Sequence, residues 1–219
     1  MKILKSFMAA MIIFLLSANT ALAAAATDSD MIDATSPDAD IQVMETYEHS
    51  SEWGYKYLIA VCQNNTDEDL EVSWDTVSYD ANNNILETGS SYSSYVVGRQ
   101  WFVLYALFLD SDDAETYDYK INIDSAQYIV PAQKDVTLEA EMSSNGKLII
   151  QATNNSDKDI STIQAATLFF DEDHNIVGFE DSYVVNSNYN VKAGETVVND
   201  LTPPDGADTY EIYYTAYRY

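Results

Sequence analysis

The chain has 219 residues, with 36 Asp and Glu against 10 Lys and Arg, and a formal net charge of −26 at pH 7. Because phosphate recognition needs a cationic patch and the basic residues here are few and scattered, the composition argues against nucleic acid or an anionic membrane surface as a partner. Cys62 is the only cysteine, so the chain has no internal disulfide and a hydrophobic core must stabilise it.

The first segment is predicted to be a secretory signal peptide, residues 1–23. Lys2 and Lys5 precede an apolar run over residues 7–16, and the segment ends in Ala-Leu-Ala at residues 21–23. The run is shorter than the roughly 20 residues that a membrane-spanning helix needs, so we expect cleavage after Ala23 rather than insertion. The mature protein is therefore predicted to be secreted or extracellular, in some contexts associated with the cell envelope.

Residues 24–40 are small and acidic and contain one proline, Pro37. This composition predicts a disordered acidic leader. Beyond it, short runs of alternating apolar and polar residues recur between Asn, Asp and Gly clusters, and no helical stripe appears. The rest of the chain is therefore predicted to be all-β.

The chain contains an internal repeat. LIAVCQNNTDEDL at residues 58–70 aligns with LIIQATNNSDKDI at residues 148–160, and DAETYDYKI at residues 113–121 aligns with GADTYEIYY at residues 206–214. Repeats of this length, with short strands and frequent turns, suit immunoglobulin-like β-sandwiches. We predict two tandem domains of this kind, at residues 41–124 and 125–219.

The repeat also indicates which face of a strand lies inside. Every second residue from 58 to 62 is matched by an apolar residue in the second copy, whereas Val61, on the alternate face, is matched by Gln151. The first set is therefore predicted to point into the core. Cys62 belongs to that set and is matched by Ala152, so we expect a small core residue rather than a nucleophile.

The loop inside the repeat reads NNTDEDL at residues 64–70 and NNSDKDI at residues 154–160. It has three interpretations: a glycosylation acceptor, a calcium loop, or a turn between two strands. Neither copy has a following glycine or an obvious completing ligand, and the glycosylation acceptor pattern is a weak signal on its own. We favour the turn.

NNSDKDI is followed by a strand that ends in Phe-Phe-Asp at residues 169–171, then by Asn-Ile-Val at 175–177 and Lys-Ala-Gly-Glu-Thr at 192–196. These residues resemble the bacterial FxLYD-type domains. The first copy matches at NNTDEDL and at residues 79–80 but reads Gly-Arg-Gln-Trp at 98–101, and Thr76 and Thr167 stand where the motif has phenylalanine. The resemblance implies immunoglobulin-like modules of exported and lipid-anchored proteins, and it implies no catalytic residue.

Two short acidic segments have the D-x-[DN]-x-[DN] spacing of calcium loops. They comprise Asp80, Asn82 and Asn84 in the first copy, and Asp171, Asp173 and Asn175 in the second. An EF-hand loop also needs glycine at its sixth position and glutamate at its twelfth, and both copies have isoleucine and serine there. Since Asp and Asn also favour tight connections, we predict hairpin turns and keep weak calcium binding as the alternative. No other cofactor is expected.

Nucleophilic catalysis has little support in the sequence. His49 and His174 are the only histidines, and no nucleophile-elbow glycine pattern is present. Carboxylate pairs of the kind that glycosidases use occur on any surface this acidic, so they carry no information. We predict a protein that is not an enzyme, with a secreted hydrolase using surface carboxylates as the alternative from another class.

Residues 101–109 read WFVLYALFL, whereas the second copy is polar at several of the matching positions. A strand that is apolar on both faces is expected to be covered on both faces. One face should pack in its own core, and the other, with Trp101 and Tyr105, should contact the second domain or a partner. We favour the second domain.

The last strand, YEIYYTAYRY, is predicted to point Tyr213, Tyr217 and Tyr219 outward, where they would form a tyrosine stripe that stacks on sugars or anchors a protein. We therefore predict an exported bacterial binding or scaffolding protein of the cell envelope or extracellular space, with a protein or glycan at the cell surface as its partner. A carbohydrate-binding module that uses the exposed tyrosines is the alternative.

Overall fold

The computed structural model describes residues 39–219, which lie within one compact unit. The predicted signal peptide and residues 24–38 of the predicted leader lie outside the described residues. The last two leader residues depart from the predicted disorder, because Ala39 is buried and the carbonyl of Asp40 accepts a 2.8 Å hydrogen bond from the backbone N–H of Asn65. They join the first strand to the loop after the second.

The described chain is all-β, as predicted, apart from one short 3-10 helix, η1 (Gln133–Asp135). Among residues 39–219, no helix has the length and apolar character needed to cross a membrane.

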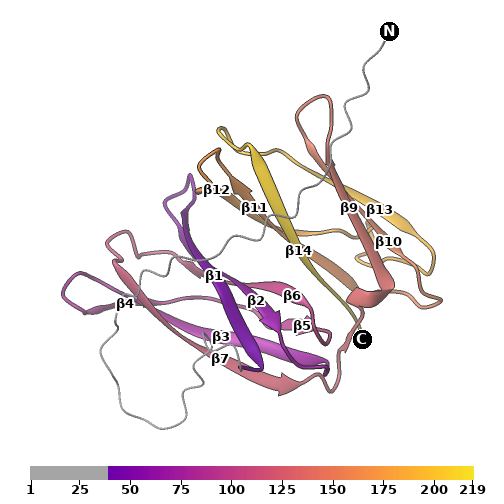
Figure 1. The fold of residues 1–219 in the computed structure, drawn as a ribbon, viewed down its shortest axis with the longest axis horizontal. Coiled ribbons are helices and arrows are strands. Elements are labelled where there is room, and N and C mark those ends of the chain that lie inside the picture. Colours follow the sequence, from indigo (N-terminus) through magenta and orange to yellow (C-terminus); the bar gives the residue numbers. More distant parts are fainter. Residues whose placement is uncertain (1–38) are drawn as a thin grey trace. The chain divides into compact units, whose positions relative to one another are not determined.

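The strands up to residue 125 form two antiparallel sheets that pack against each other (Figure 1). One sheet has the order β1-β2-β6, and in the other β3 pairs with β4, β5 and β7. Their bounds are β1 (Ile41–Ser50), β2 (Lys56–Asn64), β3 (Leu70–Tyr79), β4 (Ile85–Thr88), β5 (Ser94–Val96), β6 (Trp101–Phe108) and β7 (Thr116–Ser125). A core around Trp74, Phe102 and Phe108 lies between the sheets. We call this the N-terminal sandwich.

The strands from residue 130 onward repeat the arrangement. One sheet has the order β13-β10-β9, and the other has the order β12-β11-β14-β8. Their bounds are β8 (Val130–Pro131), β9 (Val136–Met142), β10 (Leu148–Asn154), β11 (Thr162–Phe170), β12 (Ile176–Tyr183), β13 (Thr196–Leu201) and β14 (Thr209–Arg218). A core around Leu148, Ile150 and Phe169 fills this C-terminal sandwich.

The predicted inward phase of the repeated strands is confirmed. Residues 58, 60 and 62 of β2 lie in the N-terminal core, and residues 148, 150 and 152 of β10 lie in the C-terminal core. Cys62 is fully buried, and that burial raises the pKa of its thiol to about 12. A thiol in this setting stays protonated at neutral pH, so Cys62 is a core residue.

The loop NNTDEDL is organised by the buried side chain of Asn64. Its Nδ2 donates to the carbonyls of Glu68 at 2.9 Å and Val97 at 3.1 Å. Its Oδ1 accepts from the backbone N–H of Thr66 at 2.9 Å and from the hydroxyl of the same residue at 2.8 Å. One amide therefore closes its own loop and joins that loop to the turn before β6.

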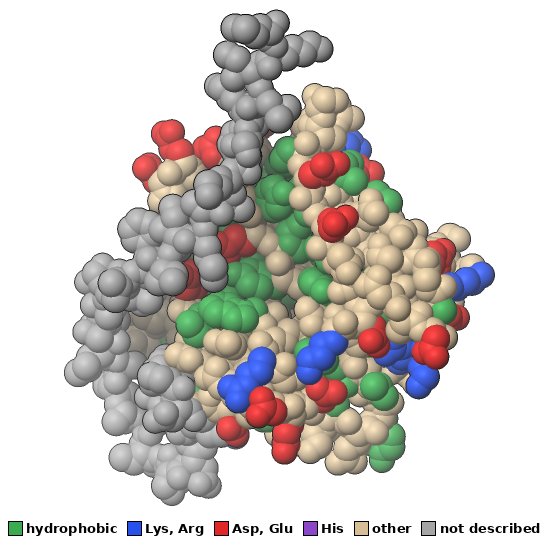
Figure 2. All heavy atoms as spheres, turned by 45° about the vertical axis from the view of Figure 1, so that its right-hand side comes forward, with side chains coloured by type: hydrophobic (Ala, Val, Ile, Leu, Met, Phe, Trp, Pro, Cys, Tyr) green, Lys and Arg blue, Asp and Glu red, His purple; other side chains and the backbone are tan. Residues whose placement is uncertain are grey.

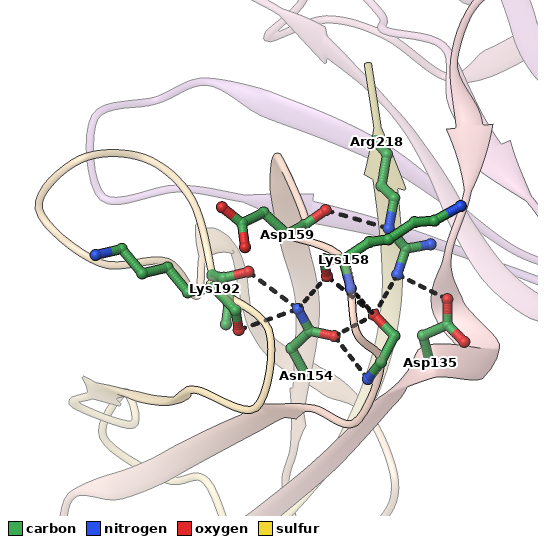
Figure 3. A network of polar contacts seen from close by, with 8 residues as sticks. Asp135, Asn154, Lys158, Asp159, Lys192 and Arg218 are labelled. Atoms are coloured by element: carbon green, nitrogen blue, oxygen red, sulfur yellow. Dashed lines mark hydrogen bonds and ion pairs between the residues drawn. The ribbon is translucent and has the colours of Figure 1, made fainter.

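The loop NNSDKDI uses Asn154 in the same way (Figure 3). Its Nδ2 donates to the carbonyls of Lys158 at 2.8 Å, Val191 at 3.1 Å and Lys192 at 3.1 Å. Its Oδ1 accepts from the backbone N–H of Ser156 at 3.0 Å and from its hydroxyl at 2.8 Å. We call this arrangement of Asn64 and Asn154 the asparagine staple.

An aspartate of each loop adds a second link to the same turn. Asp69 Oδ1 accepts from the backbone N–H of Gly98 at 3.3 Å, and Asp159 Oδ1 accepts from that of Ala193 at 3.0 Å. The repeated motif is therefore a turn, as favoured. Because Asn64 and Asn154 are fully buried and both donate through their amide nitrogen, they are not glycosylation acceptors in the folded chain.

The turns that the staples hold differ at one backbone position. Arg99 has φ +67° in the N-terminal sandwich, and Gly194 has φ +71° at the equivalent place in the C-terminal one. Gly98, the glycine of the first copy, is instead equivalent to Ala193, since the backbone N–H of each donates to the aspartate of its loop. The side chain of Arg99 forms a 2.8 Å ion pair with Asp67.

Arg218 ties the end of the last strand to the staple of the C-terminal sandwich (Figure 3). It donates through Nη2 to Ser156 Oγ at 2.7 Å and through Nε to the carbonyl of Asp159 at 3.1 Å. It also forms a 2.7 Å ion pair with Asp135. These contacts position the C-terminal tyrosines.

The second apolar face of β6 packs against the other sandwich. A cluster separate from the two cores joins Ile59, Val61 and Val103 of the β1-β2-β6 sheet to Leu168 and Phe170 of β11. We call this contact the seam. Residues 102–108 are therefore covered on both faces, and the second cover is the C-terminal sandwich, as favoured, whereas Trp101 and Leu109 at the ends of the predicted segment are exposed.

Candidate binding cleft at the seam

The seam contains a polar network beside its apolar cluster. The Tyr105 hydroxyl donates to Asp181 Oδ2 at 2.6 Å, and Gln164 Nε2 donates to the same oxygen at 2.7 Å. The acid comes from β12, the tyrosine from β6 and the amide from β11. The network therefore connects strands of both sandwiches.

Three aromatic rings gather next to this network. The ring centroids of Tyr105 and Phe179 lie 5.0 Å apart, those of Tyr57 and Phe179 lie 5.5 Å apart, and those of Tyr57 and Tyr105 lie 6.3 Å apart. Tyr57 is on β2 and Phe179 is on β12. Rings at these separations pack favourably, so both sandwiches supply one aromatic wall.

A cleft of about 300 Å³ opens over this wall. Its lining consists of Tyr57, Ser90, Tyr92, Tyr105, Leu107, Phe179, Glu180 and Asp181. It contains four aromatic rings and two carboxylates, and no Lys or Arg lines it. We call it the seam cleft.

The two carboxylates of the seam cleft differ in exposure, since Asp181 is half-buried and Glu180 is exposed. Burial raises the pKa of Asp181, although the hydrogen bonds from Tyr105 and Gln164 oppose that rise. Partial desolvation also raises the pKa of Glu180, and the neighbouring Asp181 charge adds to the effect. Tyr105 has its pKa raised by burial and by the adjacent acid, so it remains a hydrogen-bond donor at neutral pH.

A larger groove continues from the seam cleft and shares Tyr57, Phe179 and Glu180 with it. This groove encloses about 910 Å³. It adds the exposed ring of Trp53 and further acids, and no Lys or Arg lines it; the added acids are Glu52, Asp200 and Asp205. On the face drawn in Figure 2, hydrophobic side chains gather in patches and acidic ones are spread around them.

The predicted tyrosine stripe is only partly free. The outward phase is correct, because Tyr210, Ile212 and Tyr214 pack toward the C-terminal core. Tyr213, however, packs against the seam cluster and donates to Glu211 Oε2 at 2.8 Å. The prediction of an exposed Tyr213 is wrong, because the N-terminal sandwich covers this face of β14.

Tyr217 is also half-buried rather than fully exposed. Its ring contacts that of Tyr95 from β5, with centroids 5.2 Å apart, and that of Tyr219, with centroids 5.7 Å apart. Tyr219 itself is 84% exposed. The stripe is therefore reduced to an exposed terminal ring beside a pair of rings that bridges the two sandwiches.

The two predicted site residues on β6 lie in different places. Tyr105 is in the seam cleft, whereas Trp101 is 43% exposed and lines a separate hollow of about 430 Å³ together with Arg99 and Lys134. Phe179 and Asp181 were not predicted as partners of Tyr105. The available signal was β11, which reads TIQAATLFF and is apolar on both faces, as β6 is.

The weak calcium candidates form hairpin turns. Asp80 Oδ1 accepts from the backbone N–H groups of Asn82 and Asn84, both at 2.8 Å. Asp171 Oδ1 accepts in the same way from Asp173 at 3.0 Å and Asn175 at 2.8 Å. These bonds lower the pKa of both aspartates, with the Asn84 and Asn175 side chains as the largest cause. Within residues 39–219, no three His, Cys, Asp or Glu side chains gather into a metal-binding group.

The histidines lie apart from each other. His174 stacks on Phe170 with centroids 4.4 Å apart, and His49 lines the larger groove, where burial lowers the pKa of its imidazole. Neither is hydrogen-bonded to a nucleophile among the described side-chain contacts. The arrangement of the seam cleft suits binding: rings to stack on, and acids to accept hydrogen bonds or pair with a cation.

Comparison with known proteins gives no family. No family model matches the chain, and no curated protein matches it. Among solved structures, a red sea bream transglutaminase has 11% identity and a TM-score of 0.26, and the match covers 81% of this chain and 29% of that one. The CBM22-1-CBM22-2 tandem domain of Xyn10C from Paenibacillus barcinonensis has 9% identity and a TM-score of 0.17, covering 80% of this chain and 82% of that one. The chain thus spans under a third of the transglutaminase, and likenesses this low carry no argument about function.

Proposed function

We propose that this protein is an exported, non-enzymatic binding module of the cell envelope or extracellular space, and that its ligand enters the seam cleft. The observation that carries the proposal is the composition of the cleft. Aromatic rings and two carboxylates, of which that of Asp181 is half-buried, line a concavity of about 300 Å³. Concave sites with apolar walls and a few convergent polar groups are where ligands usually bind.

The position of the cleft supports a role in binding. Tyr57 and Tyr105 come from one sandwich and Phe179 and Asp181 from the other. A site at a junction between two packed units is a frequent location for ligands. Both copies of the repeat are needed for this site, since either copy alone would supply only part of the lining.

The test is an array of glycans and peptides probed with the labelled protein and with Tyr57→Ala. We expect Tyr57→Ala to lose the retained ligand, because it removes a ring from the aromatic wall. Tyr128→Ala is the matched control, since Tyr128 is 88% exposed and lies outside the cleft. Equal retention by the wild type and Tyr57→Ala would overturn the proposal.

A carbohydrate-binding module is the second candidate, and the terminal rings favour it. Tyr219 is highly exposed beside the Tyr95–Tyr217 pair, and flat exposed rings stack on sugars. Loss of glycan retention in Tyr217→Ala and Tyr219→Ala, with no effect of Tyr57→Ala, would select this candidate over the seam cleft.

We also propose membership in the FxLYD-type family and export by the predicted signal peptide. The shared asparagine staple supports a common origin of the two copies, because the same buried side chain makes the same contacts in each. Expression in a bacterial host, with mass measurement of the secreted product, tests cleavage after Ala23. Retention of residues 1–23 in the mature product would contradict it.

A further inference from the structure

We propose that the seam cleft binds a positively charged peptide and receives the ammonium group of a lysine side chain. This inference rests on the proposed function and specifies its ligand. It is carried by charge complementarity between the cleft, its aromatic wall and the adjoining groove.

The charges that line the cleft are unbalanced. Glu180 and Asp181 are neighbours on β12, where Asp181 is half-buried and Glu180 is exposed, and no Lys or Arg lines the cleft or the adjoining groove. Gln164 and Tyr105 donate to a single oxygen of Asp181, Oδ2. A partly buried carboxylate is stabilised by a cation, and a ligand is the natural source where the lining supplies none.

The aromatic wall adds to the attraction for a cation. Tyr57, Tyr105 and Phe179 form a contiguous group of rings beside the two acids. The faces of such rings attract ammonium groups, most strongly where water is partly excluded. The aliphatic stem of lysine also packs on aromatic surface while its charged end reaches a carboxylate.

The adjoining groove favours a peptide over a small free amine. The groove has a volume of about 910 Å³, three times the 300 Å³ of the cleft, and the two share three lining residues. Its own carboxylates continue the acidic lining; they are Glu52 and Asp205, and Asp200, which forms an ion pair with Lys147. His49 also lines the groove, and burial lowers the pKa of its imidazole, so it contributes no positive charge at neutral pH. An extended chain with several cations matches this lining.

The experiment measures binding of a fluorescent pentalysine peptide to the full chain by anisotropy. We expect saturable binding that weakens as salt rises and that falls about tenfold in Glu180→Gln, a conservative change in a partner of the cation. Tyr57→Phe should retain binding, and Tyr57→Ala should reduce it. Unfolding curves of each variant show that the fold is kept.

Two controls separate the cleft from general attraction to an acidic surface. Glu139→Gln removes the same charge from an exposed position on β9, outside the cleft, and should leave binding within about twofold. The second control is the same peptide with acetylated lysines, which keeps the length and removes the charge. Equal effects of Glu139→Gln and Glu180→Gln, or equal binding of the acetylated peptide, would overturn the proposal.

Two further outcomes overturn this inference and distinguish it from the proposed function. If butylammonium binds as tightly as pentalysine, the ligand is a small amine and the proposal of a peptide ligand is wrong. A neutral oligosaccharide that binds in a Tyr57-dependent manner, while pentalysine does not bind, rejects the cation and leaves the proposed function standing. If no ligand of either kind depends on Tyr57, both proposals fail.

Discussion

The two sandwiches share their loops and cores but differ on their faces. Each has an asparagine staple with matching contacts. On the β1-β2-β6 sheet, Val61 and Val103 are buried at the seam, whereas the equivalent sheet of the C-terminal sandwich has Gln151 exposed and Val198 60% exposed. The repeat therefore preserves what folds each copy and varies what each copy contacts.

The second contacting face shows the same contrast. Ala166 of β11 is buried at the seam, and its counterpart on β3 is Asp75, which is exposed and accepts from Asn122 at 2.9 Å. Two unlike faces thus meet once, and their counterparts are more polar. If each sandwich had both apolar faces, this head-to-tail contact could repeat from one molecule to the next without end. The polar counterpart faces favour a contact that is limited to the two sandwiches of one chain.

Among the features that the two sandwiches share, removal of an asparagine staple is expected to have the largest effect on stability. Asn154→Ala deletes a buried side chain that makes several hydrogen bonds and leaves carbonyls unpaired, so we expect a loss of about 3 kcal/mol in the free energy of unfolding. Asn155→Ala, its exposed neighbour, should cost less than about 1 kcal/mol. Urea denaturation measures both. Similar losses for the two variants would show that the staple has no special role.

The difference between faces is tested by one substitution at matched positions. Val103→Asp places a charge in the seam and should cost about 2 kcal/mol or more, whereas Val198→Asp should cost less than about 1 kcal/mol. Val103 is the informative position, because its neighbour Leu104 lies in the core of its own sandwich. Thermal unfolding followed by tyrosine fluorescence measures the pair. Equal costs would contradict a covered face on β6.

The turns that the staples hold allow a smaller test. Gly194→Ala should cost about 1 kcal/mol from its positive φ alone, since nothing lies within 4 Å of an added Cβ. Arg99→Gly should relieve the same strain and lose only an exposed ion pair, giving a gain of up to about 1 kcal/mol. Denaturation midpoints show whether each variant is more or less stable than the wild type. A destabilised Arg99→Gly would contradict the strain at this position.

The smallest expected effect is on the pH dependence of the free energy of unfolding. Because burial raises the pKa of Asp181 in the folded protein, the folded state holds that proton more tightly than the unfolded state does. Its contribution to stability is fully present below the unfolded pKa, about 3.9, and is lost as pH rises through the folded pKa. Asp181→Asn should flatten stability against pH over that range. Parallel profiles for variant and wild type would exclude the effect.

The sequence predicted the features that the two copies share. Cys62 was identified as a core residue and NNTDEDL as a turn because the second copy shows which substitutions each position accepts. The staple itself was not predicted, because the partners of Asn64 include the carbonyl of Val97, a residue distant in the chain. Only the folded sandwich brings that carbonyl within reach.

The seam cleft could not be predicted from the sequence, for a related reason. Tyr105 was predicted as a site residue from the apolar character of β6, but Asp181 and Phe179 become its neighbours only when the two sandwiches pack. The same packing covers Tyr213, which the alternation on β14 had placed on a free face. Periodicity gives the direction of a side chain relative to its own sheet and not what lies opposite that sheet.

The most direct test of the seam is the nuclear Overhauser effect between aromatic ring protons of the two sandwiches. With Tyr105 and Phe179 selectively labelled, the account predicts strong cross-peaks, since their ring centroids are 5.0 Å apart. Cross-peaks between Tyr95 and Tyr217 should accompany them, because those centroids are 5.2 Å apart. The absence of both sets in a folded sample would contradict the packed seam and, with it, the cleft proposed to bind the ligand.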